Sequence, residues 1–139
     1  MPSKYTSLAQ LIAQVESSGD QYAYRFEPAY IPRDQDIIAM QHLCECSFDS
    51  AKILTASSFG LYQIMGFNLL DLGLKLSPLK YCAVPELQTQ FFQEFIFKNG
   101  IAYTLDEVVN DVQKRLDFAG KYNGNADVYA SEMMRVYNS

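Results

Sequence analysis

The pattern of apolar positions along the chain predicts a mostly helical protein. Apolar side chains recur every three or four residues in four clear stretches, at residues 8–15, 85–98, 105–116 and 126–137. Weaker helical patterns cover residues 34–46 and 59–70, and the pair Ser77-Pro78 is typical of a helix start. No stretch shows the sustained alternation of a β-strand. We therefore expect a mostly α fold of about six to eight helices.

The remaining segments predict loops. Aromatic and polar side chains alternate over residues 20–30 before a proline-containing stretch, which indicates a loop or a short extended segment. Residues 47–58 show no clear period and are interpreted as a loop. Gly60 and Gly66 interrupt the 59–70 pattern, and a glycine weakens a helix interior by about 1 kcal/mol. We expect the backbone there to approach a packed helix or a ligand closely.

Size and charge narrow the class of protein. With 139 residues the chain is expected to form a single domain over residues 1–139. A net charge of −5 argues against nucleic acid as a partner, because phosphate binding needs a basic face. No run is apolar enough to span a bilayer, so no membrane insertion is expected. Lys4 is followed by no apolar run, so no signal peptide is expected and synthesis in the cytoplasm is inferred.

The cysteines give no disulfide framework. Three are present, Cys44, Cys46 and Cys82, which leaves one unpaired in any disulfide scheme. A bridge between Cys44 and Cys46 would be strained. The single histidine, His42, adds too few ligands for a zinc site. We expect free thiols, no metal and no cofactor.

Glu16 is the strongest candidate for chemistry. It follows the apolar face formed by Leu8, Leu11, Ile12 and Val15, in a helix that Ser7 can cap and Gly19 can end. A carboxylate in the last turn meets the negative end of the helix dipole and here borders apolar side chains. Both effects favour a raised pKa and a held proton. The alternative is a solvated carboxylate near a helix end.

Three segments together resemble a known family. The Glu-Ser-Ser-Gly of residues 16–19 is similar to the Glu-Ser motif of soluble lytic transglycosylases, which belong to the lysozyme-like superfamily. Residues 60–65, Gly-Leu-Tyr-Gln-Ile-Met, resemble the family's second motif, and residues 121–124, Lys-Tyr-Asn-Gly, resemble its third. The Arg-Phe-Glu-Pro of residues 25–28 is similar to a segment of a phage subgroup. The motifs occur in the family's order.

The resemblance implies a lysozyme-like fold with Glu16 in a cleft between helices. It implies cleavage of the β-1,4 bond between N-acetylmuramic acid and N-acetylglucosamine in peptidoglycan glycan strands. Glu16 would act first as acid and then as base, and the product would be a 1,6-anhydromuramic end. The chain departs from the family at Tyr62, where a methionine is usual, and at Lys121, where an apolar or aromatic residue is usual.

The resemblance also assigns substrate-binding residues, each with a structural alternative. Tyr122 would hold Glu16 through its hydroxyl, or be a core tyrosine. Gln63 would bond sugar groups, or be a solvated helix residue. Asn123 would support substrate or form a turn before Gly124. Ser17 would bond near Glu16 or help to end the helix.

Glu27 decides between two mechanisms. As a second catalytic carboxylate it would make the enzyme a hydrolytic muramidase, for which spacings of about 5 or 6.5–9.5 Å are needed. We favour instead a role in positioning, through pairing with Arg25 or Arg33. Asp34 and Asp36 are interpreted as dipole partners at a helix start.

Four hypotheses follow in order of preference. The first is a phage-type lytic transglycosylase, either an endolysin released through a holin or a virion component. The second is a muramidase of the same fold. The third is a non-catalytic glycan-binding or structural module, and the fourth is a helical interaction domain whose motifs arise by chance.

Overall fold

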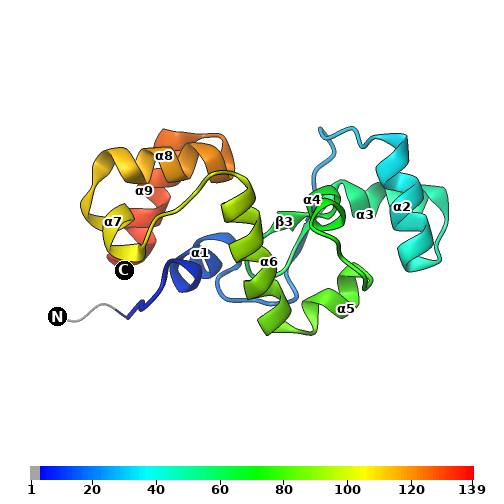
Figure 1. Ribbon diagram of the computed structural model, residues 1–139, viewed down its shortest axis with the longest axis horizontal. Helices are drawn as coiled ribbons and strands as arrows, with labels where there is room; N and C mark the ends of the chain where they lie inside the picture. Colours follow the sequence, from blue (N-terminus) through cyan, green and yellow to red (C-terminus); the bar gives the residue numbers. More distant parts are fainter. Residues whose placement is uncertain (1–3) are drawn as a thin grey trace.

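The computed structural model describes residues 4–139, in which nine helices surround one small antiparallel sheet of three strands (Figure 1). The predicted mostly α, lysozyme-like class is confirmed. In chain order the elements are α1 (Leu8–Ser17), β1 (Tyr24–Phe26), α2 (Asp34–Cys44), α3 (Phe48–Thr55), β2 (Ser57–Phe59), β3 (Ile64–Met65), α4 (Gly66–Asp71), α5 (Pro78–Cys82), α6 (Pro85–Lys98), α7 (Leu105–Asn110), α8 (Val112–Asn123) and α9 (Ala126–Tyr137).

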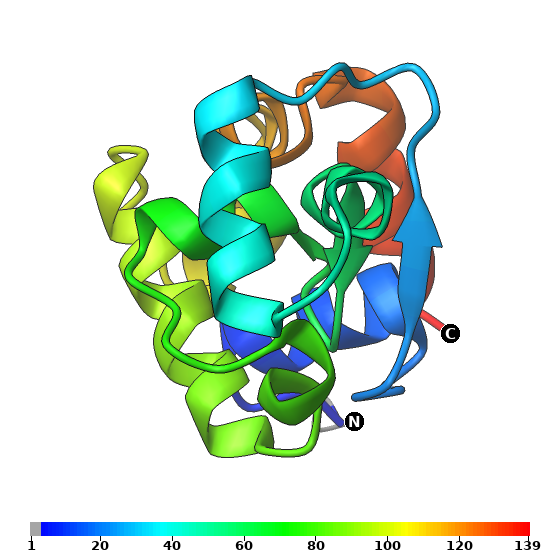
Figure 2. The same cartoon turned by 90° about the vertical axis from the view of Figure 1, so that its right-hand side faces the viewer.

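The helices gather on two sides of a central pair. Figure 1 shows α7, α8 and α9 on one side and α2, α3, α4 and the sheet on the other, with α1 and α6 between them. Figure 2 shows α2 in front and β1 at one edge of the molecule. The strand order is β1-β2-β3, so β1 is an edge strand of the sheet. None of the helices in residues 4–139 has both the length and the apolar character needed to cross a bilayer.

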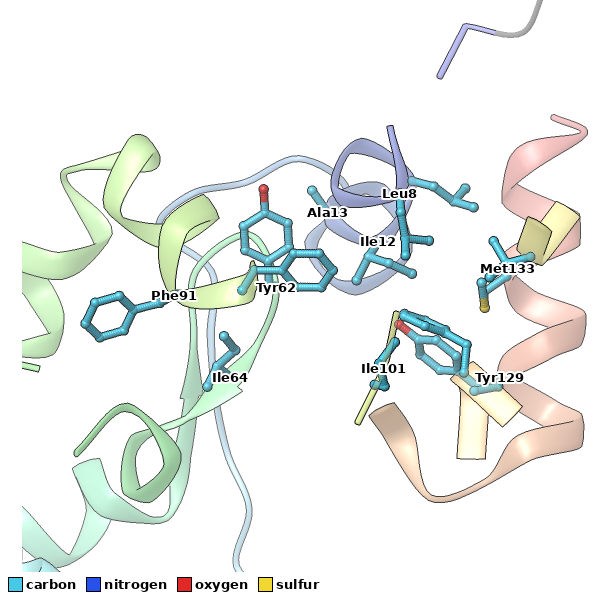
Figure 3. Packing of buried hydrophobic residues seen from close by; sticks show 14 of the residues in the cluster. Leu8, Ile12, Ala13, Tyr62, Ile64, Phe91, Ile101, Tyr129 and Met133 are labelled. Atoms are coloured by element: carbon cyan, nitrogen blue, oxygen red, sulfur yellow. The ribbon is translucent and has the colours of Figure 1, made fainter. Parts of the chain in front are cut away.

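The main core forms where α1 meets α9 and α6. Leu11 and Ile12 of α1 are completely buried, as is Met133 of α9. In Figure 3, Met133 and Tyr129 extend from α9 toward the side of α1 that carries Ile12. Burying one such aliphatic side chain stabilises the fold by about 1.5–3 kcal/mol. This packing fixes the end of α1, and therefore the position of Glu16, against the last helix.

Several predicted helix ends are confirmed by their capping bonds. The Ser7 side chain accepts a hydrogen bond from the backbone N–H of Gln10 at 3.2 Å and begins α1. Helix α1 ends with Ser18 and Gly19 both in the left-handed region, at φ 55° and 80°. Thr104 and Glu107 form a capping box at the start of α7, a pairing whose Thr-x-x-Glu spacing stands in the sequence. These ends are set by local side chains, which is why the sequence predicts them.

The expected loop at residues 47–58 is wrong, because α3 occupies most of it. The Ser47 hydroxyl accepts a hydrogen bond from the Ser50 N–H at 3.1 Å and caps this helix. Its buried face consists of only Ala51 and Thr55, one turn apart. A helix of eight residues with two small buried positions gives too weak a period to be recognised.

The expected helix at residues 59–70 is wrong over its first half. Strands β2 and β3 pair antiparallel there, with Phe59 opposite Ile64, and only α4 is helical. Gly60, at φ 81°, and Gln63, at φ 52°, turn the chain between the two strands. Strands of three and two residues are too short for alternation to show in the sequence.

The close approach expected at the two glycines is confirmed. A Cβ atom on Gly66 would lie 2.3 Å from the Leu54 carbonyl oxygen at the end of α3. A Cβ atom on Gly60 would lie 2.2 Å from Oε1 of Gln88. Gln88 is completely buried and accepts a hydrogen bond from the Leu61 N–H at 2.7 Å, so α6 holds the turn directly.

The single helix expected over residues 105–116 is divided in two. Asp111 adopts an extended conformation, with ψ 111°, and its side chain accepts a hydrogen bond from the Lys114 N–H at 3.1 Å. It therefore ends α7 and caps α8. Helix α8 then runs on to Asn123, which places the third motif in its last turn. Cys44, Cys46 and Cys82 are all free thiols.

Candidate active site

The three motif segments meet at one cavity of about 360 Å³. It lies between the part of the molecule that holds the sheet and the part that holds α8. Its walls come from α1, from all three strands with the turn between β2 and β3, and from α4, α6 and α8. The lining residues are Glu16, Arg25, Glu27, Ser58, Gln63, Ile64, Met65, Asn68, Phe95, Tyr122 and Asn123. Five of the six predicted site residues are among them, and Ser17 is not.

Glu16 lies half-buried in the last turn of α1, at the wall of this cavity. Burial raises the pKa of its carboxyl group above 4.5, and a hydrogen bond from Tyr129 partly opposes that rise. The predicted direction of the pKa is therefore confirmed, with burial as its main cause. A carboxyl group with a raised pKa keeps its proton to higher pH than a solvated one and can deliver it to a bound group.

The hydroxyl that holds Glu16 belongs to Tyr129, which corrects the expectation for Tyr122. Tyr129 donates a hydrogen bond to Oε2 of Glu16 at 2.5 Å. Tyr122 instead donates to the carbonyl oxygen of Tyr62 at 2.7 Å. The Tyr62 carbonyl belongs to the turn between β2 and β3, so Tyr122 connects α8 to that turn.

Tyr122 still forms part of the cavity wall. Its ring stacks on Phe118 with centroids 5.4 Å apart and meets Phe92 and Phe95 edge-on. The ring of Tyr129 lies 5.9 Å away. Burial, together with the nearby charge of Glu16, raises the pKa of Tyr122 well above its ordinary value, so the hydroxyl remains a donor. Tyr122 is therefore both a core residue, through its ring contacts, and a residue of the cavity wall.

Gln63 is already engaged within the protein. Its side-chain N–H groups donate to the carbonyl oxygens of Ala23, at 3.2 Å, and Gly60, at 2.9 Å. Its Oε1 accepts from the Ser58 hydroxyl at 2.7 Å. Both amide hydrogens are thus used, and Gln63 has only remaining acceptor capacity to offer a ligand. Its position in a turn, not on a helix, corrects the sequence interpretation.

Glu27 is paired with Arg25. The Nε of Arg25 lies 3.0 Å from Oε1 of Glu27, and both side chains line the cavity beside β1. Arg33, the other expected partner, pairs with Asp36 at 3.0 Å at the start of α2. Asp36 is therefore paired within the start of α2, whereas the Arg25–Glu27 pair faces the cavity.

Ser17 and Asn123 make local contacts. The Ser17 hydroxyl donates to the Ala13 carbonyl oxygen at 2.9 Å, within α1. The side-chain oxygen of Asn123 accepts from the Asn125 N–H at 3.3 Å across the turn at Gly124. Asn123 lies at the cavity and Ser17 supports the helix end. No group of three or more His, Cys, Asp and Glu side chains in residues 4–139 is arranged to hold a metal ion.

Sequence reasoning missed several residues of the site. Tyr129 lies in the apolar stripe of α9 with Met133 and Val136, and nothing in that stripe marks its hydroxyl as different from a core contact. Tyr129 reaches the site only through Glu16, whereas Asn68 and Phe95 line the cavity itself. Asn68 follows the second motif by three residues, which is the one signal that pointed toward it.

Fold and site together define a lysozyme-like, mostly helical protein with a partly buried carboxylic acid in its cleft. No family model matches the chain, and no solved structure matches it. The chain is 37% identical over 143 residues to the endolysin of Enterobacteria phage PRD1. The aligned region covers 96% of this chain and 95% of that protein. It therefore belongs to the family of this phage endolysin.

Proposed function

We propose that the protein cleaves the β-1,4 bond between N-acetylmuramic acid and N-acetylglucosamine in peptidoglycan, as a phage-type lytic transglycosylase. The relative's name, endolysin, supports an enzyme that degrades the bacterial cell wall. The observation that carries the proposal is Glu16, whose pKa is raised by burial at the wall of a cavity and whose carboxylate is held by Tyr129. The cavity is large enough to take part of a glycan chain.

In the proposed reaction Glu16 acts twice. Its carboxyl proton passes to the glycosidic oxygen as the bond between that oxygen and the muramic C1 breaks, and N-acetylglucosamine leaves with a free 4-hydroxyl group. The carboxylate then takes the proton of the muramic 6-hydroxyl as O6 bonds to C1. The product is a 1,6-anhydro ring, and Glu16 regains its proton, so no water is consumed. Tyr129 stabilises the carboxylate between the two steps.

A hydrolytic muramidase is the second candidate, and one observation favours it. Glu27 lines the same cavity as Glu16, and a second carboxylate is what glycoside hydrolysis ordinarily uses. Its ion pair with Arg25 favours the positioning role instead, because a nucleophile or base must be released from its partner to act. We therefore place Glu27 and Arg25 as a fixed polar pair that contacts the glycan, together with Gln63, Tyr122 and Asn123 along the wall.

The test is digestion of purified peptidoglycan, with the soluble products analysed by mass spectrometry. The wild type should give fragments with 1,6-anhydromuramic ends, one water lighter than hydrolysis products, and the Glu16→Gln variant should release none. Fragments with only reducing muramic ends would overturn the transglycosylase route in favour of hydrolysis. No release by the wild type, with Glu16→Gln binding peptidoglycan equally well, would instead indicate a non-catalytic module.

The Glu27→Gln variant separates the two candidates independently of product mass. It keeps the size of the side chain and removes the charge that pairs with Arg25. A positioning role predicts a loss of rate of about tenfold or less, with anhydro products unchanged. A catalytic role predicts a loss of about 10²–10⁴-fold, close to that of Glu16→Gln.

The place of action follows from this proposal. Peptidoglycan glycan strands are the partner, and the protein would reach them either through a holin or as part of a virion. Assaying purified virions and the soluble fraction of infected cells for the protein would distinguish these two routes.

A further inference from the structure

A second, smaller cavity adjoins the cleft. It has a volume of about 170 Å³ and lies between α4 and α6. Asn68 and Phe95 line both cavities, so the smaller one continues the wall that begins at Glu16. Its other lining residues are Asp71, Leu72, Lys98 and Asn99. A group attached to a sugar in the cleft can therefore extend into it.

The side chains of this smaller cavity suit a charged peptide better than a neutral sugar. Lys98 is exposed and makes no ion pair or hydrogen bond through its ammonium group within residues 4–139. Asp71 places a carboxylate on the same cavity. Leu72 and Phe95 add apolar surface to the same cavity. Where the lactyl carboxyl of muramic acid is bound in an amide, the sugars give a lysine no charged partner, whereas a short peptide offers carboxylates, amines and amide groups.

The mixed charge also argues against a small free anion. Asp71 repels phosphate or acetate from the cavity, and the whole chain carries a net charge of −5. A ligand that carries a positive and a negative charge is attracted by both Asp71 and Lys98. Asn68 adds a side-chain amide that can hydrogen-bond to a peptide group. The side-chain Nδ2–H of Asn99 donates to the Phe95 carbonyl oxygen at 2.7 Å, which leaves its Oδ1 as an acceptor for a ligand.

We propose that this cavity binds the peptide stem that peptidoglycan carries on the lactyl group of N-acetylmuramic acid, with the Lys98 ammonium receiving a stem carboxylate. The inference rests on the proposed function, since it assigns the substituent of a substrate whose sugar lies beside Glu16. It makes the enzyme selective for glycan strands that still bear their stems.

The experiment compares two soluble substrates of equal glycan length. One is a set of glycan oligomers with stems. The other is the same set after an amidase has removed the stems and the lactyl carboxylates freed by that cleavage have been capped as neutral methylamides. The wild type should cleave the stem-bearing oligomers with a kcat/KM about fivefold higher, the size expected of one partly exposed ion pair. In Lys98→Met the ratio should fall to about 1, and in Lys98→Arg it should be largely kept.

Lys80→Met is the matched control, because it removes the same charge from an exposed lysine that lines neither cavity. Its ratio should equal that of the wild type. Lys98 also lies in the last turn of α6, where a cation favours the helix dipole. A purely structural role would lower the Tm of Lys98→Met and leave the ratio unchanged, which would overturn the stem site.

The two proposals fail in different ways. If the wild type cleaves neither substrate, the proposed function is wrong. If it cleaves both with the same efficiency, or if Lys98→Met keeps the wild-type ratio, only the stem site is wrong. A ratio that falls in Lys98→Met and not in Lys80→Met supports the stem site.

Discussion

Tyr129 donates its hydroxyl to Oε2 of Glu16 at 2.5 Å, although the two residues are 113 positions apart in the sequence. The bond joins α9, the last helix, to the end of α1. Because it engages one carboxyl oxygen, the other oxygen is left to carry the proton. The pair therefore couples the packing of the last helix to the state of the proposed acid, and Tyr129 acts as a positioning residue.

The Tyr129→Phe variant should shift the pH dependence of activity. The Tyr129 hydrogen bond lowers the pKa of Glu16 and so opposes the rise caused by burial. Its removal should raise that pKa further. Since the first step needs a protonated Glu16, the alkaline fall in kcat/KM should move to higher pH. Loss of positioning should also lower the maximal rate by about tenfold. A pH profile of cell-wall clearing measures both effects.

Tyr103→Phe is the control for this prediction. Its hydroxyl donates to Oδ2 of Asp117 at 2.5 Å, and neither residue lines the cleft. The variant removes one tyrosine hydroxyl from an equally short bond, so its profile should coincide with that of the wild type. An alkaline limb of Tyr129→Phe that moved to lower pH would contradict the role assigned to this hydrogen bond.

The Glu16→Gln variant should be more stable than the wild type at alkaline pH. Burial raises the pKa of Glu16 above 4.5, so the folded protein holds this proton more tightly than the unfolded chain. The resulting stability is present in full below pH 4.5 and is lost as the pH rises through the raised pKa. Glutamine stays neutral throughout. Melting curves should therefore coincide at about pH 3.5 and separate at about pH 8, with the variant higher. A variant that melts lower than the wild type at about pH 8 would refute this account.

The helices that the sequence predicts are those that carry their own signals. Helices α1, α6 and α9 each combine a long apolar face with recognisable residues at their ends, and their bounds match the prediction closely. A short extended segment was one of the two alternatives for residues 20–30, and β1 lies there. Helix α3 and strands β2 and β3 were missed because each is short and is stabilised by distant partners. Phe59, for example, pairs with Tyr24 on β1, 35 positions earlier in the sequence (59 − 24), and no local pattern records that pairing.

The site was predictable in outline and not in its contacts. The motifs brought Glu16, Gln63 and Tyr122 to one cavity, as the family resemblance implied. The sequence did not reveal that the Tyr122 hydroxyl turns to the Tyr62 carbonyl oxygen while Tyr129 takes its place at Glu16. Tyr122 lies in α8 and Tyr129 in α9, and each belongs to an apolar face of its helix. Which of the two hydroxyls reaches Glu16 depends on how α8 and α9 are rotated about their axes. That rotation depends on packing over the whole core.

Two glycine substitutions should change stability in opposite directions. Gly66→Ala would place a Cβ atom 2.3 Å from the Leu54 carbonyl oxygen, so backbone must move, at a cost of about 1–3 kcal/mol. Gly120→Ala in α8 would place its Cβ 3.5 Å from that of Ala126, an ordinary contact, and should gain up to about 1 kcal/mol from helix propensity. Urea titrations of both variants give the two free energies of unfolding. Equal effects would show that α4 can move away from α3 freely.

The three thiols should differ in reactivity toward a disulfide reagent such as Ellman's. Cys82 is buried, and burial raises its pKa to about 11, so little thiolate exists there near neutral pH. Cys44 and Cys46 are half-buried at the end of α2. In the folded protein the reagent should reach Cys46 and Cys44, and Cys82 only after unfolding in urea. The double variant Cys44→Ser, Cys46→Ser provides the control. It should release no colour when folded and the equivalent of one thiol when unfolded, and rapid reaction of its folded form would show that Cys82 is accessible.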